Sequence, residues 1–181
     1  MKDIKIIKME IDGKIIDNIS NVFNFRNSGI HNVSVKLESA EVLSLLFYNI
    51  TEIKSITFWD NKNTEKVSLM NDLFSECKNL EYVDMSRLNW ENNHCLMNMF
   101  KNNKKLKEIK FPKYESHKVY WFYGMFYGCE SLEEIDMPNL FNNKGVYFQE
   151  MFKGCINLGL INLNNFSKFG ILRISSHQPE L

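Results

Sequence analysis

A 26-residue repeat is the feature of this sequence that most constrains its fold. Phenylalanine recurs at steps of 27, 26, 26 and 26 residues, and apolar residues keep fixed places around it. These phenylalanines, called the anchors below, are Phe47, Phe74, Phe100, Phe126 and Phe152. The apolar columns lie one and four residues before each anchor and six, nine and eleven after it. Repeats of this length indicate a solenoid, in which residues one period apart are neighbours in space.

Each repeat is predicted to contain a short helix followed by a short strand. The residues seven and four places before the anchor, together with the anchor itself, follow helical spacing, as in Val119, Phe122 and Phe126. Gly128 and Gly154 lie two residues after their anchors, where such a helix would end. Helices often end in a residue with left-handed backbone geometry, which glycine adopts easily. The predicted strands, of the form Leu-x-x-Ile-x-Leu, are 80–85, 106–111, 132–137 and 158–163. The expected fold class is therefore α/β: about five helix–strand repeats with a parallel sheet on one face.

We expect one structural domain with atypical ends, because a solenoid must cover the apolar faces of its terminal coils. Its parts are an N-terminal β cap at 1–40, the repeats at 41–169, and a short C-terminal cap and tail at 170–181. Within the first cap, Asp12-Gly13 between two apolar runs predicts a β-hairpin over 4–16. Further strands are expected at 33–37 and 170–176.

Charges on the outward strand positions support the predicted register. Ten residues after the anchors stand Thr57, Asp84, Lys110, Asp136 and Asn162. Seven after them stand Lys54, Glu81, Lys107, Glu133 and Gly159. Charge alternates in sign along both columns, so neighbouring parallel strands would attract each other rather than repel.

The repeat also resembles a known family. The motif Met-Phe-x-Gly-Cys-x-x-Leu-x-x-Leu-Asp-Leu, carried here by 125–137 and again by 151–163, is similar to the bacterial surface-protein (BspA-like) type of leucine-rich repeat in its 26-residue version. A third copy runs from Phe74 to Ser86. The resemblance covers about 130 residues and implies a leucine-rich-repeat solenoid. Members of that family act mainly in adhesion and protein binding.

Composition argues against several function classes. Lys plus Arg and Asp plus Glu both number 22, so no overall field favours nucleic acid or an anionic membrane. The N-terminus has no signal-peptide core, and no apolar run could span a bilayer. As written, the sequence predicts a cytoplasmic protein, and a surface or secreted one if an export signal was removed.

The cysteines are expected to be small apolar fillers rather than a metal or redox site. Cys77, Cys129 and Cys155 share one repeat column, and Cys95 lies elsewhere. Free cysteine is commonly buried, and a disulfide between Cys129 and Cys155 would be unusual in a reducing cytosol. No Cys-x-x-Cys spacing suggests zinc.

An aromatic cluster is the first candidate site. Tyr120, Tyr123 and Tyr127 are spaced to share one exposed face of the predicted fourth helix, and equivalent positions elsewhere are mostly polar. Trp121 and Tyr147 share a flanking column that we expect to be half buried. The predicted helix-side patch is Tyr120, Trp121, Tyr123, Tyr127, Tyr147 and Met97. Its composition is that of a protein-binding hot spot, although covering loops or a second copy could bury these rings.

The outer face of the sheet is the second candidate binding surface, because solenoid faces make extended platforms. Its residues are Tyr82, Asp84, Glu108, Lys110, Glu134 and Asp136. The carboxylates could form an acid pair for hydrolysis, but neighbouring lysines favour solvated ion pairs. The four histidines lie in unrelated contexts, and no catalytic, cofactor or metal motif is present.

The sequence therefore predicts a non-enzymatic module that binds another protein, needs no cofactor, and is a monomer or weak homo-oligomer. Two settings are open: a host- or surface-interaction protein, or an intracellular regulator or inhibitor, for example one encoded by a mobile element. The alternatives are a self-assembling structural unit and a hydrolase that uses the sheet-face carboxylates.

Overall fold

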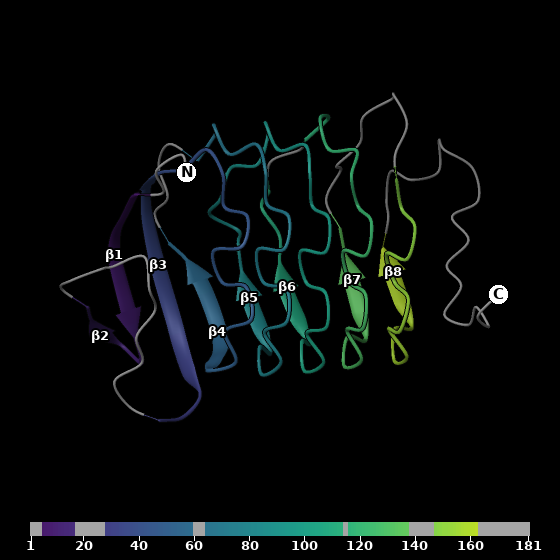
Figure 1. The fold of residues 1–181 in the computed structure, drawn as a ribbon, viewed down its shortest axis with the longest axis horizontal. Helices are drawn as coiled ribbons and strands as arrows, with labels where there is room; N and C mark the ends of the chain where they lie inside the picture. The colour runs from purple at the N-terminus through teal and green to yellow at the C-terminus, as the bar shows by residue number, and fades with distance from the viewer. Residues whose placement is uncertain (1–4, 17–27, 60–63, 114–115, 138–146, 163–181) are drawn as a thin grey trace.

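The strands of successive coils lie side by side along one axis (Figure 1). The computed structural model describes residues 5–16, 28–59, 64–113, 116–137 and 147–162. The strands are β1 (Lys5–Ile11), β2 (Lys14–Ile15), β3 (His31–Ser39), β4 (Ile53–Phe58), β5 (Tyr82–Asp84), β6 (Glu108–Lys110), β7 (Glu134–Asp136) and β8 (Leu160–Asn162). The strand expected at 170–176 lies outside the described residues.

The N-terminal β cap contains the predicted hairpin. Asp12 and Gly13, with φ of 50° and 76°, join β1 to β2. Two consecutive positive φ values characterise the two-residue turn that suits the twist of a hairpin, and Asp-Gly favours it. The predicted strand at 33–37 is also confirmed, within β3. Because β3 pairs antiparallel with β1 and parallel with β4, it joins the cap to the first coil.

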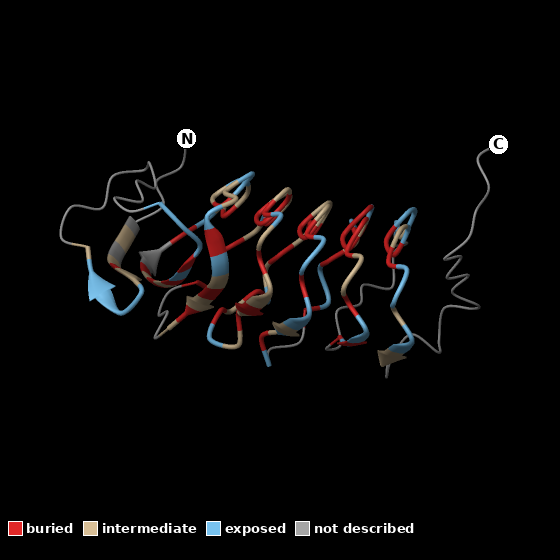
Figure 2. Ribbon diagram, turned by 90° about the horizontal axis from the view of Figure 1, so that it is seen from below, coloured by how far each residue is buried: buried red, intermediate tan, exposed pale blue. Residues whose placement is uncertain are grey.

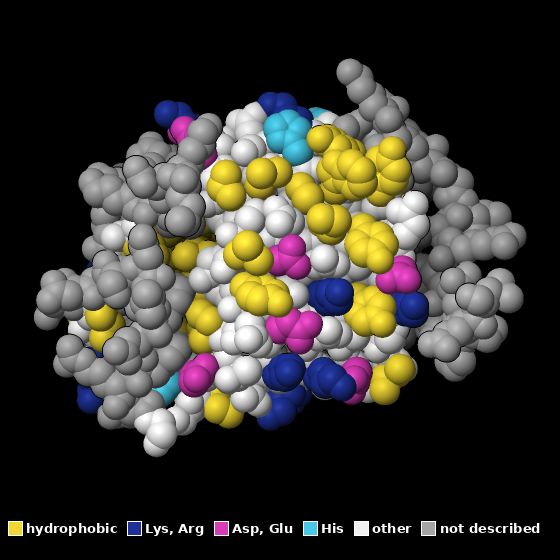
Figure 3. Space-filling view, viewed as in Figure 1, with side chains coloured by type: hydrophobic (Ala, Val, Ile, Leu, Met, Phe, Trp, Pro, Cys, Tyr) yellow, Lys and Arg dark blue, Asp and Glu magenta, His cyan; other side chains and the backbone are white. Residues whose placement is uncertain are grey.

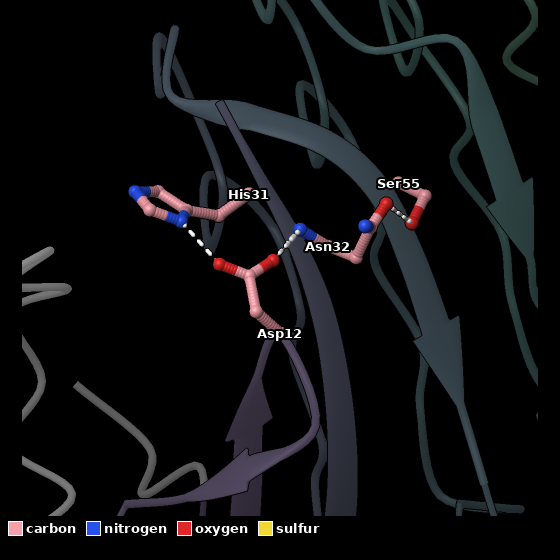
Figure 4. A network of polar contacts seen from close by, with 4 residues as sticks. All are labelled: Asp12, His31, Asn32 and Ser55. Carbon is pink, nitrogen blue, oxygen red and sulfur yellow. Dashed lines mark hydrogen bonds and ion pairs between the residues drawn. The ribbon is translucent and has the colours of Figure 1, made fainter. Parts of the chain in front are cut away.

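A chain of hydrogen bonds fixes the hairpin turn to the solenoid (Figure 4). The Asp12 carboxylate lies 2.6 Å from His31 Nδ1 and accepts a 2.9 Å bond from the Asn32 amide. The Asn32 side chain in turn accepts a 2.7 Å bond from the Ser55 hydroxyl on β4. The turn is thus tied to two successive strands of the sheet.

The parallel register agrees with the apolar columns. Val83 pairs with Ile56 on one side and with Ile109 on the other, and Ile135 pairs with Ile161. The strands form a six-stranded sheet of order β2-β1-β3-β4-β5-β6 and a separate two-stranded sheet of β7 and β8. The predicted stacking of 26-residue coils and the parallel sheet are therefore confirmed.

The predicted helices are wrong: none of the described residues is helical, and the fold is a β-solenoid rather than an α/β solenoid. In the segment 70–77, the amides of Leu73, Ser75 and Cys77 donate to carbonyls three residues earlier in their own coil. The intervening amides donate instead to carbonyls of the next coil; that of Phe74, for example, reaches Met99 at 2.9 Å. Successive turns, hydrogen-bonded to the neighbouring coil, replace each helix.

Left-handed residues mark these turns in every coil. Two residues before and two after each anchor, φ is positive at Leu45, Asn49, Asp72, Glu76, Asn98, Asn102, Gly124, Gly128, Glu150 and Gly154. An α-helix of L-residues cannot contain such residues at four-residue intervals, because each of them interrupts the helical backbone. Gly128 and Gly154 do adopt the predicted left-handed geometry, but within the turns and not at a helix end.

Coil spacing explains why turns form here. Neighbouring strands lie about 4.8 Å apart, whereas a helix with side chains is about 10 Å wide. A helical layer could follow that spacing only if the solenoid curved strongly. Turns that hydrogen-bond from coil to coil match it directly, so the turns and the strands form two parallel layers in Figure 2.

The core between these layers contains an uninterrupted row of phenyl rings. Consecutive anchors stack with centroid separations of 5.6, 5.3, 5.6 and 5.4 Å, and no pair is tilted by more than 15°. The anchors are fully buried except Phe152, which is 6% exposed. The prediction that residues one period apart meet in one core is confirmed.

The cysteine column lies beside this row. The thiols of Cys77, Cys129 and Cys155 are buried and free, and each donates a hydrogen bond of 2.9–3.1 Å to the backbone carbonyl of the preceding repeat's anchor. This confirms their role as buried fillers. In the third coil the same position holds Asn103, which is buried with both polar side-chain atoms unpaired among the described residues.

Candidate protein-binding surfaces

An apolar row runs along the turn layer. Leu69, Cys95, Trp121 and Tyr147, called the ridge below, are linked from coil to coil by single parallel backbone bridges. The turn layer faces the viewer in Figure 3, where hydrophobic side chains gather in a row across its upper part. Trp121 and Tyr147 are 38% and 46% exposed, whereas Cys95 is buried, so only the aromatic end of this column is clearly more open than the sequence predicted.

The aromatic end of the ridge is ordered by ring contacts. Trp121 stacks on Tyr147 at 4.3 Å with only 13° between the ring planes. Tyr120 lies against Trp121 at 5.6 Å, and His94 meets Tyr120 edge-on at 6.2 Å. Because Trp121 and Tyr147 cover each other's faces, their exposed parts are ring edges and outer faces.

The remaining tyrosines of the predicted patch belong to a separate, charged cluster. Tyr123 is 38% exposed and donates a 3.1 Å hydrogen bond to Glu150, which raises the pKa of the phenol. Tyr127 is half buried, with the ammonium groups of Lys101 and Lys153 at 5.5 and 5.7 Å from its ring. The structure thus divides the predicted patch in two, and the half-buried Met97 belongs to neither set of contacts.

On the sheet face, Tyr82, Asp84 and Lys110 form a polar cluster, and the Lys110 ammonium also lies 3.9 Å from a carboxylate oxygen of Glu108. Asp84 accepts bonds from the Ser86 amide at 2.9 Å, the Ser86 hydroxyl at 2.6 Å and the Tyr82 hydroxyl at 3.2 Å. Burial alone would raise the pKa of Asp84, but these bonds outweigh it and lower that pKa. Lys110 lies over the Tyr82 ring at 5.3 Å, and the contact with Tyr82 raises the pKa of Lys110.

The other sheet-face candidates line a groove. An open groove of about 1100 Å³ lies across β6, β7 and β8, and Glu108, Glu134 and Asp136 are among its lining residues. The sequence reasoning placed these carboxylates on one face but did not identify the groove. Leu69 and Cys95 were also missing from the predicted patch, although their shared column with Trp121 was visible in the repeat.

The pKa of Asp84 is shifted away from that of a general acid. A general acid needs a raised pKa, whereas that of Asp84 is lowered. Among the described residues, no group of three or more His, Cys, Asp or Glu is placed to hold a metal ion. The part of the chain that the structure describes also has no helix that could cross a bilayer.

Comparison with protein-family models gives a match over most of the repeats. No curated protein and no solved structure matches the chain. The matched residues are 41–166, which contain all five anchors and the whole ridge. Because the match covers more than half of the chain, the protein belongs to the family described as "Mycoplasma protein of unknown function, DUF285".

Proposed function

We propose that this protein is a non-enzymatic β-solenoid that binds another protein through the aromatic end of the ridge. The observation that carries the proposal is the stacked and exposed pair of Trp121 and Tyr147. Trp and Tyr supply a large share of binding energy at protein interfaces. Both rings remain partly exposed to water, whereas the fold buries every anchor ring.

The ridge is also suited to binding with little loss of side-chain freedom. Rings held against one another have already lost most of their rotamer entropy, so a partner need not order them. Aromatic edges carry partial positive charge. The exposed ring edges would therefore make favourable contacts with backbone carbonyl oxygens and with the faces of aromatic side chains of the partner.

The test is capture of a partner with matched variants. Trp121→Ala/Tyr147→Ala removes the aromatic end of the ridge, and Leu45→Ala/Tyr48→Ala removes two side chains of similar exposure, 54% and 48%, in the first coil. Proteins captured from cell lysates by the wild type should then be purified and their Kd values measured. We expect the ridge variant to lose about 2 kcal/mol or more of binding free energy, and the control to keep wild-type affinity.

Two results would contradict the proposal. Equal affinity of both variants for the purified partner would show that the ridge is not the interface. If wild-type sedimentation showed a dimer that only the ridge variant dissociates, the ridge would serve self-association instead.

A further inference from the structure

The sheet is interrupted between β6 and β7. In other neighbouring coils, the residue seven places after the anchor donates its amide to its equivalent in the preceding coil: Glu81 to Lys54 at 2.8 Å, Lys107 to Glu81 at 2.9 Å, and Gly159 to Glu133 at 2.9 Å. Among the described residues, Glu133 makes no such bond to Lys107, and no strand pairing joins β6 to β7. The groove lies along this interruption.

One pair of residues that face each other across the gap disfavours strand pairing there. Eight residues after the anchor, the column reads Ser55, Tyr82, Glu108, Glu134 and Leu160. Glu108 and Glu134 would be direct neighbours in a continuous ladder, and like charges in that position destabilise strand pairing. The mismatch leaves the Glu133 amide and the Lys107 carbonyl without their ladder partners.

The groove is acidic around an apolar floor. Its carboxylates are Glu108, Glu133, Glu134 and Asp136, and Lys107 is its only basic residue. The three carboxylates of 133–136 are exposed and have no ion-pair partner among the described residues. Its apolar lining residues are the buried Leu132 and Ile135, the partly buried Ile109 and the exposed Leu160.

We propose that this groove binds an extended segment of a partner protein that carries lysine or arginine. Basic side chains would lie between Glu108 and Glu134 and relieve their repulsion, which gives charge complementarity. The backbone of an extended segment could bond to the unpaired amide and carbonyl of the split ladder, and its intervening apolar side chains would cover the floor. The site is on the opposite layer from the ridge and is independent of it.

Two synthetic peptides test the proposal on the full chain. One is a fluorescein-labelled nonapeptide of alternating Lys and Val, and the other replaces Lys by Glu. Fluorescence anisotropy at low salt should show binding of the basic peptide only, and added salt should weaken this binding because the carboxylates are exposed.

Matched protein variants test which carboxylates bind the peptide. The groove variant Glu133→Gln/Glu134→Gln/Asp136→Asn should weaken binding of the basic peptide about tenfold. The charge-matched control Glu52→Gln/Glu65→Gln/Glu91→Gln, whose residues lie outside the groove, should bind like the wild type.

Hydrogen exchange distinguishes peptide binding in the groove from general electrostatic attraction of basic molecules to the protein. The basic peptide should protect the amides of 107–110 and 133–136, and free spermine should not. Wild-type affinity in the groove variant, equal loss in the control variant, or protection by spermine equal to that by the peptide would each overturn the proposal. The ridge variant Trp121→Ala/Tyr147→Ala should leave peptide binding unchanged. The groove proposal and the ridge proposal can therefore fail independently of each other.

Discussion

The phenyl rings of Phe100 and Phe126 lie 5.6 Å apart and within 3° of parallel, although 26 residues separate them in the chain. The same relationship joins each anchor to the next, so each coil depends on its neighbours for burial of its anchor ring. Stability in such a stack is a sum of contacts between adjacent coils.

Removal of one ring from this row should be costly. Phe126 is fully buried between Phe100 and Phe152, so Phe126→Ala should lower the free energy of unfolding by about 3–5 kcal/mol. Tyr48→Ala, at a 48% exposed position, should change it by less than about 0.5 kcal/mol. Urea unfolding of both variants measures the difference, and similar values would mean that the anchors do not share a core.

The cysteine column predicts a stabilising substitution. Asn103 is buried with both polar side-chain atoms unpaired among the described residues, whereas cysteines in the same column donate to a carbonyl. Asn103→Cys should therefore raise the free energy of unfolding by about 1–3 kcal/mol. The reverse change in the next coil, Cys129→Asn, should lower it. A loss of stability in Asn103→Cys would show that the Asn103 amide has a partner that this account lacks.

Thiol chemistry tests the burial of the same column. Burial raises the pKa of Cys77 to about 12 and that of Cys155 to about 11, and it also raises the pKa of Cys129. Little thiolate should be present at neutral pH, so alkylation by iodoacetamide should be far slower in folded than in unfolded protein. Cys95, at 8% exposure, should react first. Mass spectrometry of labelled peptides gives the order, and fast labelling of Cys129 would contradict the packing.

The hairpin turn should make stability depend on acid pH. The hydrogen bond from His31, followed by that from the Asn32 amide, lowers the pKa of Asp12 from its ordinary 3.8. A lowered folded pKa stabilises the protein above the unfolded pKa, and this contribution disappears as pH falls through the folded value. Asp12→Asn should thus lose stability at neutral pH, and the difference from wild type should shrink below about pH 4. Unfolding curves across this range test it, and a constant difference would contradict it.

Period and register could be predicted from the sequence because they rest on burial. A stacked coil places the same apolar residue at the same depth in each repeat, so columns such as that of Val83, Ile109 and Ile135 are visible without a structure. The outward column of Glu108 and Glu134 was visible too. Its like charges could have indicated the interruption between β6 and β7.

The turn layer was predicted to be helical because its inward-facing residues are spaced three and four positions apart, as they would be on one face of a helix. Val119, Phe122 and Phe126 meet the core through successive turns as well as a helix would. The contrary signal was present in the recurring Asn, Asp and Gly two residues either side of the anchors, which tolerate left-handed geometry. The same error placed Tyr123 and Tyr127 with Tyr120 on one helix face, whereas side chains along a series of turns point in several directions.

The measurement that tests the β-solenoid most directly is the effect of Gly124→Ala on the free energy of unfolding. In the predicted helix this substitution would stabilise the protein by about 0.5–1 kcal/mol. In the observed turn, Gly124 has a φ of 57° and an added Cβ would lie 2.6 Å from Asn98 Oδ1. We expect a loss of about 1–3 kcal/mol, with Gly159→Ala, which meets nothing within 4 Å, near neutral as the control. A gain in stability for Gly124→Ala would contradict the stacked turns on which the ridge depends.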